Sequence, residues 1–369
     1  MKHSGIFSKS LSFFALLATL ALPFANAFAV GNQTRPLGDS NIFARVPAPG
    51  FPEGIAINGD RVYVSGPATF GNFQPSKVLA YDINTGALVQ EYPIQNQNFT
   101  QQHALSACAF GKKDMLYVVD TQQGIIRFDV DGVNNPQQVY ATPVPDLPTC
   151  SSVAAGTPCS PTAIDQTPLP NDIVFDKDGN LYLSDSMQAT IWRIPAGGGQ
   201  PQIWFQSAAF DTPFGPNGLR VDPTGEKLYI AVTFGFFGDG YIYTLPLVSQ
   251  PAASSLAVFH QYNAGEGPDG LAFGKSNKLY VACAGSNQIS VLRPDGTEEA
   301  RYSGPAQNPS NPAQPLPWAN PANIAFNDKT RSLLVTNHAI FFPNPTDFAA
   351  VFDVFVDDKA DHLARPNIR

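Results

Sequence analysis

The feature that most constrains this chain is a short motif that recurs along its 369 residues at nearly even spacing. Each copy has a small or proline-bearing lead-in, one oxygen-bearing side chain and a short apolar run. A second β-rich run follows about ten residues later. Clear copies occupy residues 51–57, 169–175, 215–221, 267–273 and 320–326, and a degenerate copy occupies 102–110.

The spacing of the copies predicts the architecture. Neighbouring copies are 46–54 residues apart, apart from one interval of 68 that contains an insertion at 142–168. A repeat of this length, with about four short strands in each unit, is typical of a β-propeller. Six copies therefore predict an all-β protein with six blades, in which the early run 42–46 completes the last blade. A long β-sandwich or two β domains would not explain so regular a repeat.

The composition agrees with this fold and limits the partners. The chain has 34 prolines, 30 glycines and only 14% charged residues, which favours a loop-rich β protein over a helical one. Its net charge is −8, and no dense stripe of lysine or arginine is present. Nucleic acids and anionic membranes are therefore poor partners. We expect a small-molecule substrate and a monomer.

The N-terminus predicts a secretory signal peptide over residues 1–29. Lys2, His3 and Lys9 give a basic start, 11–24 is apolar, and A-x-A cleavage sites occur at 25–27 and 27–29. The apolar run is short for a membrane span, which disfavours the alternative of an uncleaved anchor. We expect a secreted or periplasmic protein with one domain over 30–369 and no membrane contact after cleavage.

The four cysteines fall into two kinds. Cys150 and Cys159 flank a loop of small residues, and a local disulfide between them suits an oxidising compartment. Cys108 and Cys283 lie within apolar strands and are expected to be buried free thiols. A nucleophilic role for either is the alternative, but no histidine flanks them.

In a propeller the first strand of each blade lines a central channel, so the residues just before these strands gather at its mouth. Here they are Glu53, His103, Asn171, Asn217, Asp269 and Asn323. Four of these, all except His103 and Asn323, offer two carboxylates and two amide oxygens. Such a set suits Ca²⁺, whereas zinc would want more histidine or cysteine. The alternative is that these side chains only make turn hydrogen bonds.

The motifs at 52–54, 170–172, 215–218 and 267–270 resemble those of the SMP-30/gluconolactonase/luciferin-regenerating family, within the calcium-dependent phosphotriesterase superfamily. The resemblance implies a catalytic Ca²⁺ held by Glu53, Asn171, Asn217 and Asp269, and hydrolysis of lactones or phosphoesters. Gln102, His103 and Leu169 stand where sugar-lactone members commonly carry arginine or asparagine. We therefore expect a lactone or ester of apolar character.

The remaining candidates concern the substrate. The pocket we expect contains Asn323, Phe236, Phe237, Trp318 and His338, although the aromatic residues could also be ordinary blade packing. Asp269 would attack directly or activate water, and His103 would act as a base, orient the substrate or be structural. A structural role is favoured for His338.

Three other functions compete with this hypothesis. A phosphotriesterase-like hydrolase would use the same metal. A non-catalytic propeller that binds a ligand or protein would not need the four oxygen ligands. A strictosidine-synthase-like lyase is disfavoured, because such relatives often lack the calcium set.

Overall fold

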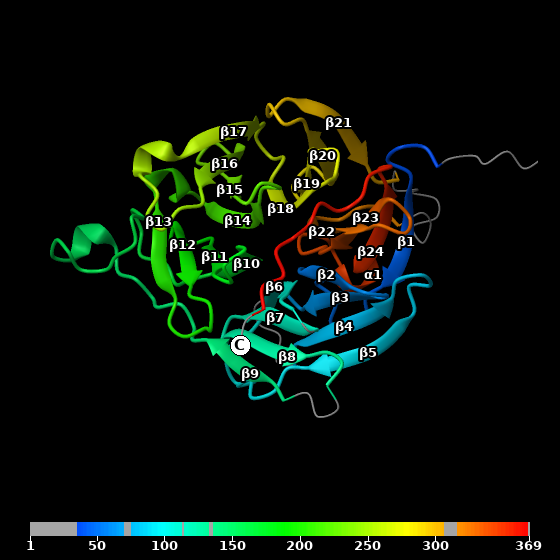
Figure 1. Cartoon of the computed structure of the whole chain (residues 1–369), viewed down its shortest axis with the longest axis horizontal. Coiled ribbons are helices and arrows are strands. Elements are labelled where there is room, and N and C mark those ends of the chain that lie inside the picture. The colour runs from blue at the N-terminus through cyan, green and yellow to red at the C-terminus, as the bar shows by residue number, and fades with distance from the viewer. Residues whose placement is uncertain (1–34, 70–74, 113, 133–135, 306–315, 368–369) are drawn as a thin grey trace, which may run out of the picture. The chain divides into compact units, whose positions relative to one another are not determined.

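Figure 1 shows the computed structural model, which describes residues 35–69, 75–112, 114–132, 136–305 and 316–367. Contacts divide the chain into a unit Met1–Arg35 and a unit Pro36–Arg369, and all of the described strands lie in the second. The predicted signal peptide lies outside the described residues. No helix in the described part of the chain is long and apolar enough to cross a membrane.

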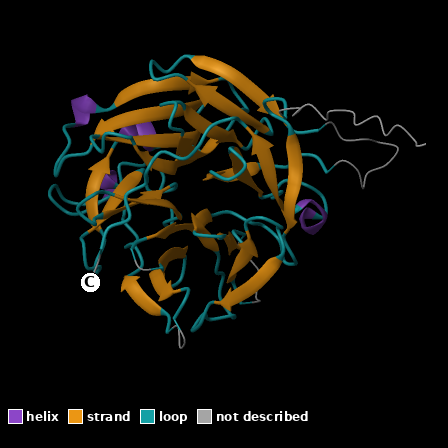
Figure 2. Ribbon diagram, turned by 45° about the vertical axis from the view of Figure 1, so that its right-hand side comes forward, coloured by secondary structure: helices purple, strands orange, loops and turns teal. Residues whose placement is uncertain are grey.

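The strands form six four-stranded antiparallel sheets arranged as the blades of a propeller (Figures 1 and 2), as the sequence predicts. Blade 1 contains β2 (Ile55–Asn58), β3 (Arg61–Gly66), β4 (Lys77–Asp82) and β5 (Leu88–Pro93), and blade 2 contains β6 (Leu105–Phe110), β7 (Met115–Asp120), β8 (Gly124–Asp129) and β9 (Gln138–Ala141). Blade 3 contains β10 (Pro170–Phe175), β11 (Leu181–Asp185), β12 (Thr190–Ile194) and β13 (Gln202–Gln206), and blade 4 contains β14 (Phe214–Val221), β15 (Lys227–Phe234), β16 (Gly240–Pro246) and β17 (Ala257–Tyr262).

Blade 5 contains β18 (Pro268–Phe273), β19 (Leu279–Cys283), β20 (Gln288–Leu292) and β21 (Glu298–Ser303). Blade 6 contains β22 (Pro321–Asn327), β23 (Ser332–Asn337), β24 (Ala350–Phe355) and β1 (Ser40–Arg45). The described helices are the short α1 (Pro345–Phe348), η1 (Cys150–Ser152), η2 (Ala208–Phe210) and η3 (Ala253–Ser255).

The ring closes where the two ends of the propeller unit meet in blade 6. β1 pairs antiparallel with β24, with Ser40 opposite Val354 and Arg45 opposite Ala350. The prediction that 42–46 completes the last blade is confirmed. This pairing gives β24 a second neighbour and covers an edge that would otherwise expose unpaired backbone groups.

Aromatic contacts join neighbouring blades in a repeated way. Tyr117 of β7 packs edge-on against Phe175 of β10 with ring centroids 5.0 Å apart, and Tyr280 of β19 packs against Phe326 of β22 at 5.3 Å. Tyr63 with Phe110 and Tyr229 with Phe273 repeat the contact. Each such pair contributes about 0.5–1.5 kcal/mol beyond the apolar area that it buries.

A bulge at the start of the inner strands prepares the functional site. Pro170, Pro268 and Pro321 are the first residues of β10, β18 and β22, positions that suit a residue without a backbone N–H. In each of these strands the pairing register shifts between the proline and the residue three places later. The two residues in between therefore leave the regular ladder and present their side chains differently from a regular strand.

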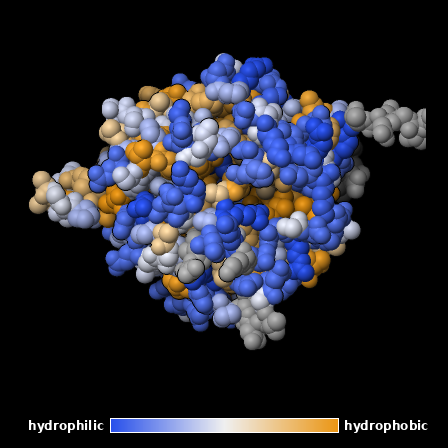
Figure 3. Space-filling view, in the orientation of Figure 1, coloured by the Kyte–Doolittle hydropathy of each residue, from blue (hydrophilic) through white to orange (hydrophobic). Residues whose placement is uncertain are grey.

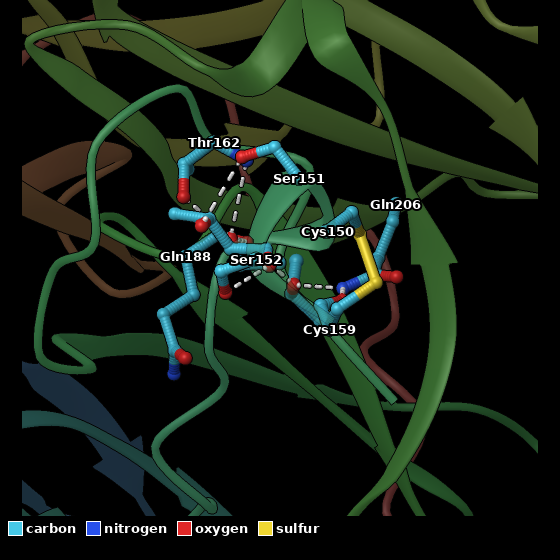
Figure 4. Close-up of a disulfide and its surroundings, with 10 residues drawn as sticks. Cys150, Ser151, Ser152, Cys159, Thr162, Gln188 and Gln206 are labelled. Carbon is cyan, nitrogen blue, oxygen red and sulfur yellow. Dashed lines mark hydrogen bonds between the residues drawn. A yellow bond between two sulfur atoms is a disulfide. The ribbon is translucent and has the colours of Figure 1, made fainter. Parts of the chain in front are cut away.

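The insertion between β9 and β10 carries the predicted disulfide (Figure 4). Cys150 and Cys159 are bonded, which confirms that prediction, and Nε2 of Gln206 in β13 donates to the carbonyl oxygen of Cys159 at 2.9 Å. Cys108 and Cys283 are free and buried, as predicted.

Candidate metal centre

The pairing register identifies one equivalent residue in each blade. This residue lies two positions before the point where regular pairing between the inner strand and its neighbour begins. We call these six residues the ring: Glu53, Ser106, Asn171, Asn217, Asp269 and Ala322. All four predicted metal ligands belong to it and all four are buried. They come from blades 1, 3, 4 and 5, so only the closed propeller brings them together.

Two predicted residues are out of register with the ring. His103 lies three residues before Ser106, in the loop before β6, where Nδ1 is 3.2 Å from the carbonyl oxygen of Gln101. Asn323 lies one residue after Ala322, at the position that Asp172 takes in blade 3. Both side chains also make the same hydrogen bond. Oδ1 of each accepts from the backbone N–H of the following residue at 2.8–2.9 Å.

The sequence contains a signal that identifies Ser106. Blade 2 has no proline at the start of its inner strand, so the motif alone points to His103. Counting back from the second strand gives the correct register, because Ser106 precedes Leu116 by ten residues, as Asn171 precedes Leu181.

The predicted pocket residues are spread over different surroundings. Trp318 is a core residue whose Nε1 donates to Oγ of Ser40 at 3.0 Å, so its side chain packs between blades. Phe236 and Phe237 are 70% and 90% exposed on the loop between β15 and β16. His338 contacts the ring directly, since its Nδ1 is 3.3 Å from Oε2 of Glu53.

Hydroxyl groups orient the two ring amides. Nδ2 of Asn171 donates to Oγ of Ser186 at 3.3 Å, and Nδ2 of Asn217 donates to Oγ1 of Thr233 at 3.0 Å. The Oδ1 atom of Asn217 is buried and accepts no hydrogen bond from the described residues. A buried acceptor without a donor is rare and costly in a folded protein. These amides therefore offer oxygen, and not nitrogen, to a ligand of the ring.

The two ring carboxyl groups lie in an environment that disfavours their charged forms. Burial raises the pKa of Glu53 to about 8, and the charge of Asp172 adds to the rise. Burial also raises the pKa of Asp269 well above its usual range, as do the charges of Glu53 and Asp172, while Asn217 lowers it. Oε2 of Glu53 is a second buried oxygen that accepts no hydrogen bond from the described residues. A bound cation would reduce the repulsion between these carboxylates and would give the two buried oxygens a ligand contact.

Further hydroxyls hold the backbone of the ring across blade boundaries. Oγ of Ser106 donates to the carbonyl oxygen of Asn171 at 2.7 Å, and Oγ of Ser184 donates to that of Asn217 at 2.6 Å. Oγ1 of Thr336 closes the circle by donating to the carbonyl oxygen of Glu53 at 2.8 Å. The positions of the ring residues therefore depend on neighbouring blades as well as on their own.

Glycine beside the ring allows its residues to come close. A Cβ atom on Gly218 would lie 2.0 Å from the carbonyl oxygen of Asp269, and one on Gly54 would lie 2.6 Å from the amide nitrogen of Cys108. Any side chain at either place would push neighbouring inner strands apart. The glycine in the recurring motif is thus a packing requirement of the channel.

The donors of the ring fit a hard divalent cation. Within the described ranges no group of three or more His, Cys, Asp or Glu residues could hold a metal. The ring instead mixes two carboxylates with two amide oxygens, which is chemistry that calcium accepts and zinc does not favour. Glu53, Asn171, Asn217 and Asp269 are the residues that would hold the ion.

Part of the sequence matches a known family. Residues 210–338 match the sequence model described as the SMP-30/Gluconolactonase/LRE-like region. The resemblance to the SMP-30/gluconolactonase family is confirmed. The matched segment includes two residues of the ring, Asn217 and Asp269, and ends at His338. No curated protein sequence matches the chain.

Solved structures of proteins named for this family have the same fold. Regucalcin from Agrobacterium tumefaciens strain C58, described as a calcium-binding protein, is 16% identical with a TM-score of 0.60, covering 90% of this chain and 97% of its own. A putative gluconolactonase is 14% identical with a TM-score of 0.56, covering 88% and 94%. A luciferin-regenerating enzyme is 12% identical with a TM-score of 0.59, covering 87% and 96%.

Proposed function

We propose that this protein is a secreted or periplasmic calcium-dependent hydrolase that cleaves a lactone or ester of apolar character. The observation that carries the proposal is the ring, where buried oxygens of Glu53 and Asn217 accept no hydrogen bond from the described part of the chain and lie beside a second carboxyl group. The family match and the gluconolactonase-like fold support the same class of reaction.

Calcium bound at the ring would supply Lewis-acid polarisation of the substrate's carbonyl oxygen. Glu53, Asn171 and Asn217 would serve as ligands held by their hydroxyl partners. Asp269 would be both a ligand and the catalytic carboxylate. It would either act as a base on water or attack the acyl carbon directly. In the first case Asp269 takes a proton from water, the water oxygen bonds to the acyl carbon, and the carbon–oxygen bond to the leaving group breaks as that oxygen gains a proton.

The surroundings of the ring support an apolar substrate. Phe236 and Phe237 are exposed on the loop that follows β15, and Phe341 is 74% exposed after β23. β15 and β23 each run antiparallel to the inner strand of their blade, so these loops follow the strand ends that lie beside the ring. Exposed aromatic side chains there would favour an acyl or aryl group over a sugar.

A substrate panel tests the proposal. Purified protein is assayed against aliphatic lactones, aryl esters, a sugar lactone and a phosphotriester, each with calcium and with excess chelator. We expect turnover of apolar lactones or esters that the chelator abolishes and calcium restores. Turnover of the phosphotriester alone would favour the phosphotriesterase alternative, and no turnover of any substrate by calcium-loaded protein would favour a binding propeller.

A further inference from the structure

A separate cavity of about 500 Å³ lies at the end of the channel opposite the ring. Its walls include the last residues of the inner strands, such as Phe110, Phe175 and Phe273, whereas the ring lies at the first residues of those strands. We call it the tail cavity, because residues 360–365 near the C-terminus form one of its walls. Its volume is in the range of small-molecule sites.

The C-terminal segment, red in Figure 1, crosses the middle of the propeller and is fixed to several blades. The amide of Asp361 donates to the carbonyl oxygen of Phe273 at 3.0 Å, and that of Lys112 donates to the carbonyl oxygen of Pro366 at 3.0 Å. Nη1 of Arg365 donates to Oδ1 of Asn58 at 2.8 Å. Figure 3 shows this face, on which hydrophobic residues are visible near the centre among hydrophilic ones. These hydrogen bonds fix the segment in place, so it forms an ordered wall of the cavity.

One position in the wall differs between blades. The register aligns six residues that all line the tail cavity: Ala56, Ala109, Val174, Arg220, Ala272 and Ala325. In five blades this position is small and apolar, and in blade 4 it carries a guanidinium. The cavity thus has mostly apolar walls with one cationic group at this level.

The end of the Arg220 side chain is available to a ligand. Its Nε donates to the carbonyl oxygen of Leu271 at 2.5 Å, but Nη1 and Nη2 donate no hydrogen bond to the described residues. The nearby carboxylate of Asp172 accepts from the amides of Ile173 and Leu219, each at 2.8 Å. Burial lowers the pKa of Arg220, and the charge of Asp172 raises it. A guanidinium group stays charged in proteins and is weakly hydrated, which suits it to a buried anionic partner.

Two other cationic residues at the tail cavity, Lys329 and Arg365, already have hydrogen-bond partners. Nζ of Lys329 bonds Oδ1 of Asp60 at 2.6 Å and Oδ1 of Asn84 at 3.0 Å. Arg365 bonds Asn58 and the backbone of Ile57. Arg220 is therefore more open to a new anionic partner than Lys329 or Arg365.

We propose that the tail cavity binds a small carboxylate with an apolar chain, such as a medium-chain fatty acid. The carboxylate accepts from Nη1 and Nη2 of Arg220, a planar fork that suits bidentate contact with two oxygens. The chain packs against the small residues of the aligned position and the phenylalanines at the strand ends. This site is separate from the ring and needs no metal.

Calorimetric titration with octanoate tests the proposal, with 1-octanol as the uncharged probe and excess chelator present to exclude binding through calcium. We expect octanoate to bind one site per chain at least about tenfold more tightly than octanol. Arg220→Met keeps length and removes the charge, so octanoate should bind about ten- to hundredfold more weakly, while octanol is unaffected. Arg220→Lys should retain part of the affinity, and Lys329→Met is the matched control that should retain all of it.

Three results would overturn the proposal: no octanoate binding by the wild type at millimolar concentration, equal affinity for octanol, or unchanged affinity in Arg220→Met. If Arg220→Met does not fold, crystals of the wild-type protein soaked in 8-bromooctanoate decide the question. Bromine density in the tail cavity with the carboxylate on Arg220 supports the site. Bromooctanoate found only elsewhere, or not at all, contradicts it.

Discussion

Nδ1 of His338 lies 3.3 Å from Oε2 of Glu53, and Nε2 of the same ring is 2.9 Å from the carbonyl oxygen of Ala68. A carbonyl oxygen only accepts, so Nε2 carries a hydrogen. Burial lowers the pKa of His338 to about 4, so the imidazole is neutral at pH 7 and Nδ1 has no hydrogen. A protonated Glu53 can therefore donate to His338 in the metal-free protein, and an ionised Glu53 is free to bind a cation.

Calcium binding should release protons and tighten as pH rises from 7 to 8. Glu53, with a pKa of about 8, is mostly protonated at pH 7 without metal, and burial also raises the pKa of Asp269 well above its usual range. A divalent ion displaces these protons, because only ionised carboxylates are good ligands. Calorimetry in buffers of different ionisation enthalpy measures the release. Calcium affinity that does not change over this pH range would contradict the prediction.

The stability of the metal-free protein should fall between pH 6.5 and 8. Between its unfolded value of 4.5 and about 8, Glu53 is ionised in the unfolded chain but neutral in the folded one, so rising pH favours unfolding. The His338 shift has the opposite sign but acts only below its unfolded value of 6.5, outside this window. Thermal unfolding of the wild type and Glu53→Gln checks this, and the variant should show the shallower slope. Equal slopes would indicate that Glu53 does not titrate in this window.

Asp269→Asn should separate metal binding from turnover. The amide keeps an oxygen and the shape but removes the charge and the basicity, so calcium binds more weakly while turnover falls by about 10²–10⁴-fold. Glu53→Gln is the matched variant that weakens calcium binding and should recover part of its activity in excess calcium. The readout is kcat at saturating calcium. A near-wild-type kcat for Asp269→Asn would make Asp269 only a ligand and direct the search for the base to His103.

Thr233→Val should weaken calcium binding without removing a ligand. Oγ1 of Thr233 accepts from Nδ2 of Asn217, so its loss frees the amide to turn its oxygen away from the ring. Substitutions of groups that orient metal ligands typically cost 10- to 100-fold in affinity. Thr233→Ser keeps the hydroxyl and should bind calcium almost as well as the wild type. Calcium titration of both variants decides the matter, and equal loss in both would assign Thr233 a packing role only.

Loss of the Cys150–Cys159 bond should lower stability and leave the ring unchanged. Releasing a loop of this sequence separation, nine residues, costs about 2–3 kcal/mol of unfolding free energy on the chain-entropy estimate. The double variant Cys150→Ser, Cys159→Ser is compared with the wild type by denaturant unfolding and calcium titration. Weaker calcium binding by the folded variant would contradict the separation of this loop from the ring.

The sequence predicted the blades because each inner strand begins with the same local chemistry, a proline or small residue followed by an apolar run. It also predicted that the early strand closes the propeller through the last blade, and it predicted the disulfide. In blade 2, Leu105 stands where other blades have proline, so the sequence motif points to His103 and not to Ser106. The sequence left Trp318 either in the substrate pocket or in blade packing, because a residue's position in the chain does not show where its indole packs, and the structure places it in the core.

The tail cavity and the contacts of Asp172 were beyond sequence analysis for a different reason. Residues 356–367 have no repeat or alternating pattern, and their place across the channel depends on bonds to Phe273, Asn58 and Lys112 in three blades. Arg220 occurs in an ordinary strand position, and only the aligned register shows that the other five blades have small residues there. These relationships between blades can be seen only in the folded propeller.

Calcium titration of the metal-free protein shows whether the ring is a metal centre. Isothermal titration at pH 8 should show one calcium ion per chain at the ring in the wild type. The double variant Glu53→Gln, Asp269→Asn should lose that site while its thermal unfolding remains cooperative. Absence of binding by the wild type at millimolar calcium, or an undiminished site in the folded double variant, would contradict the claim that these residues form a calcium centre.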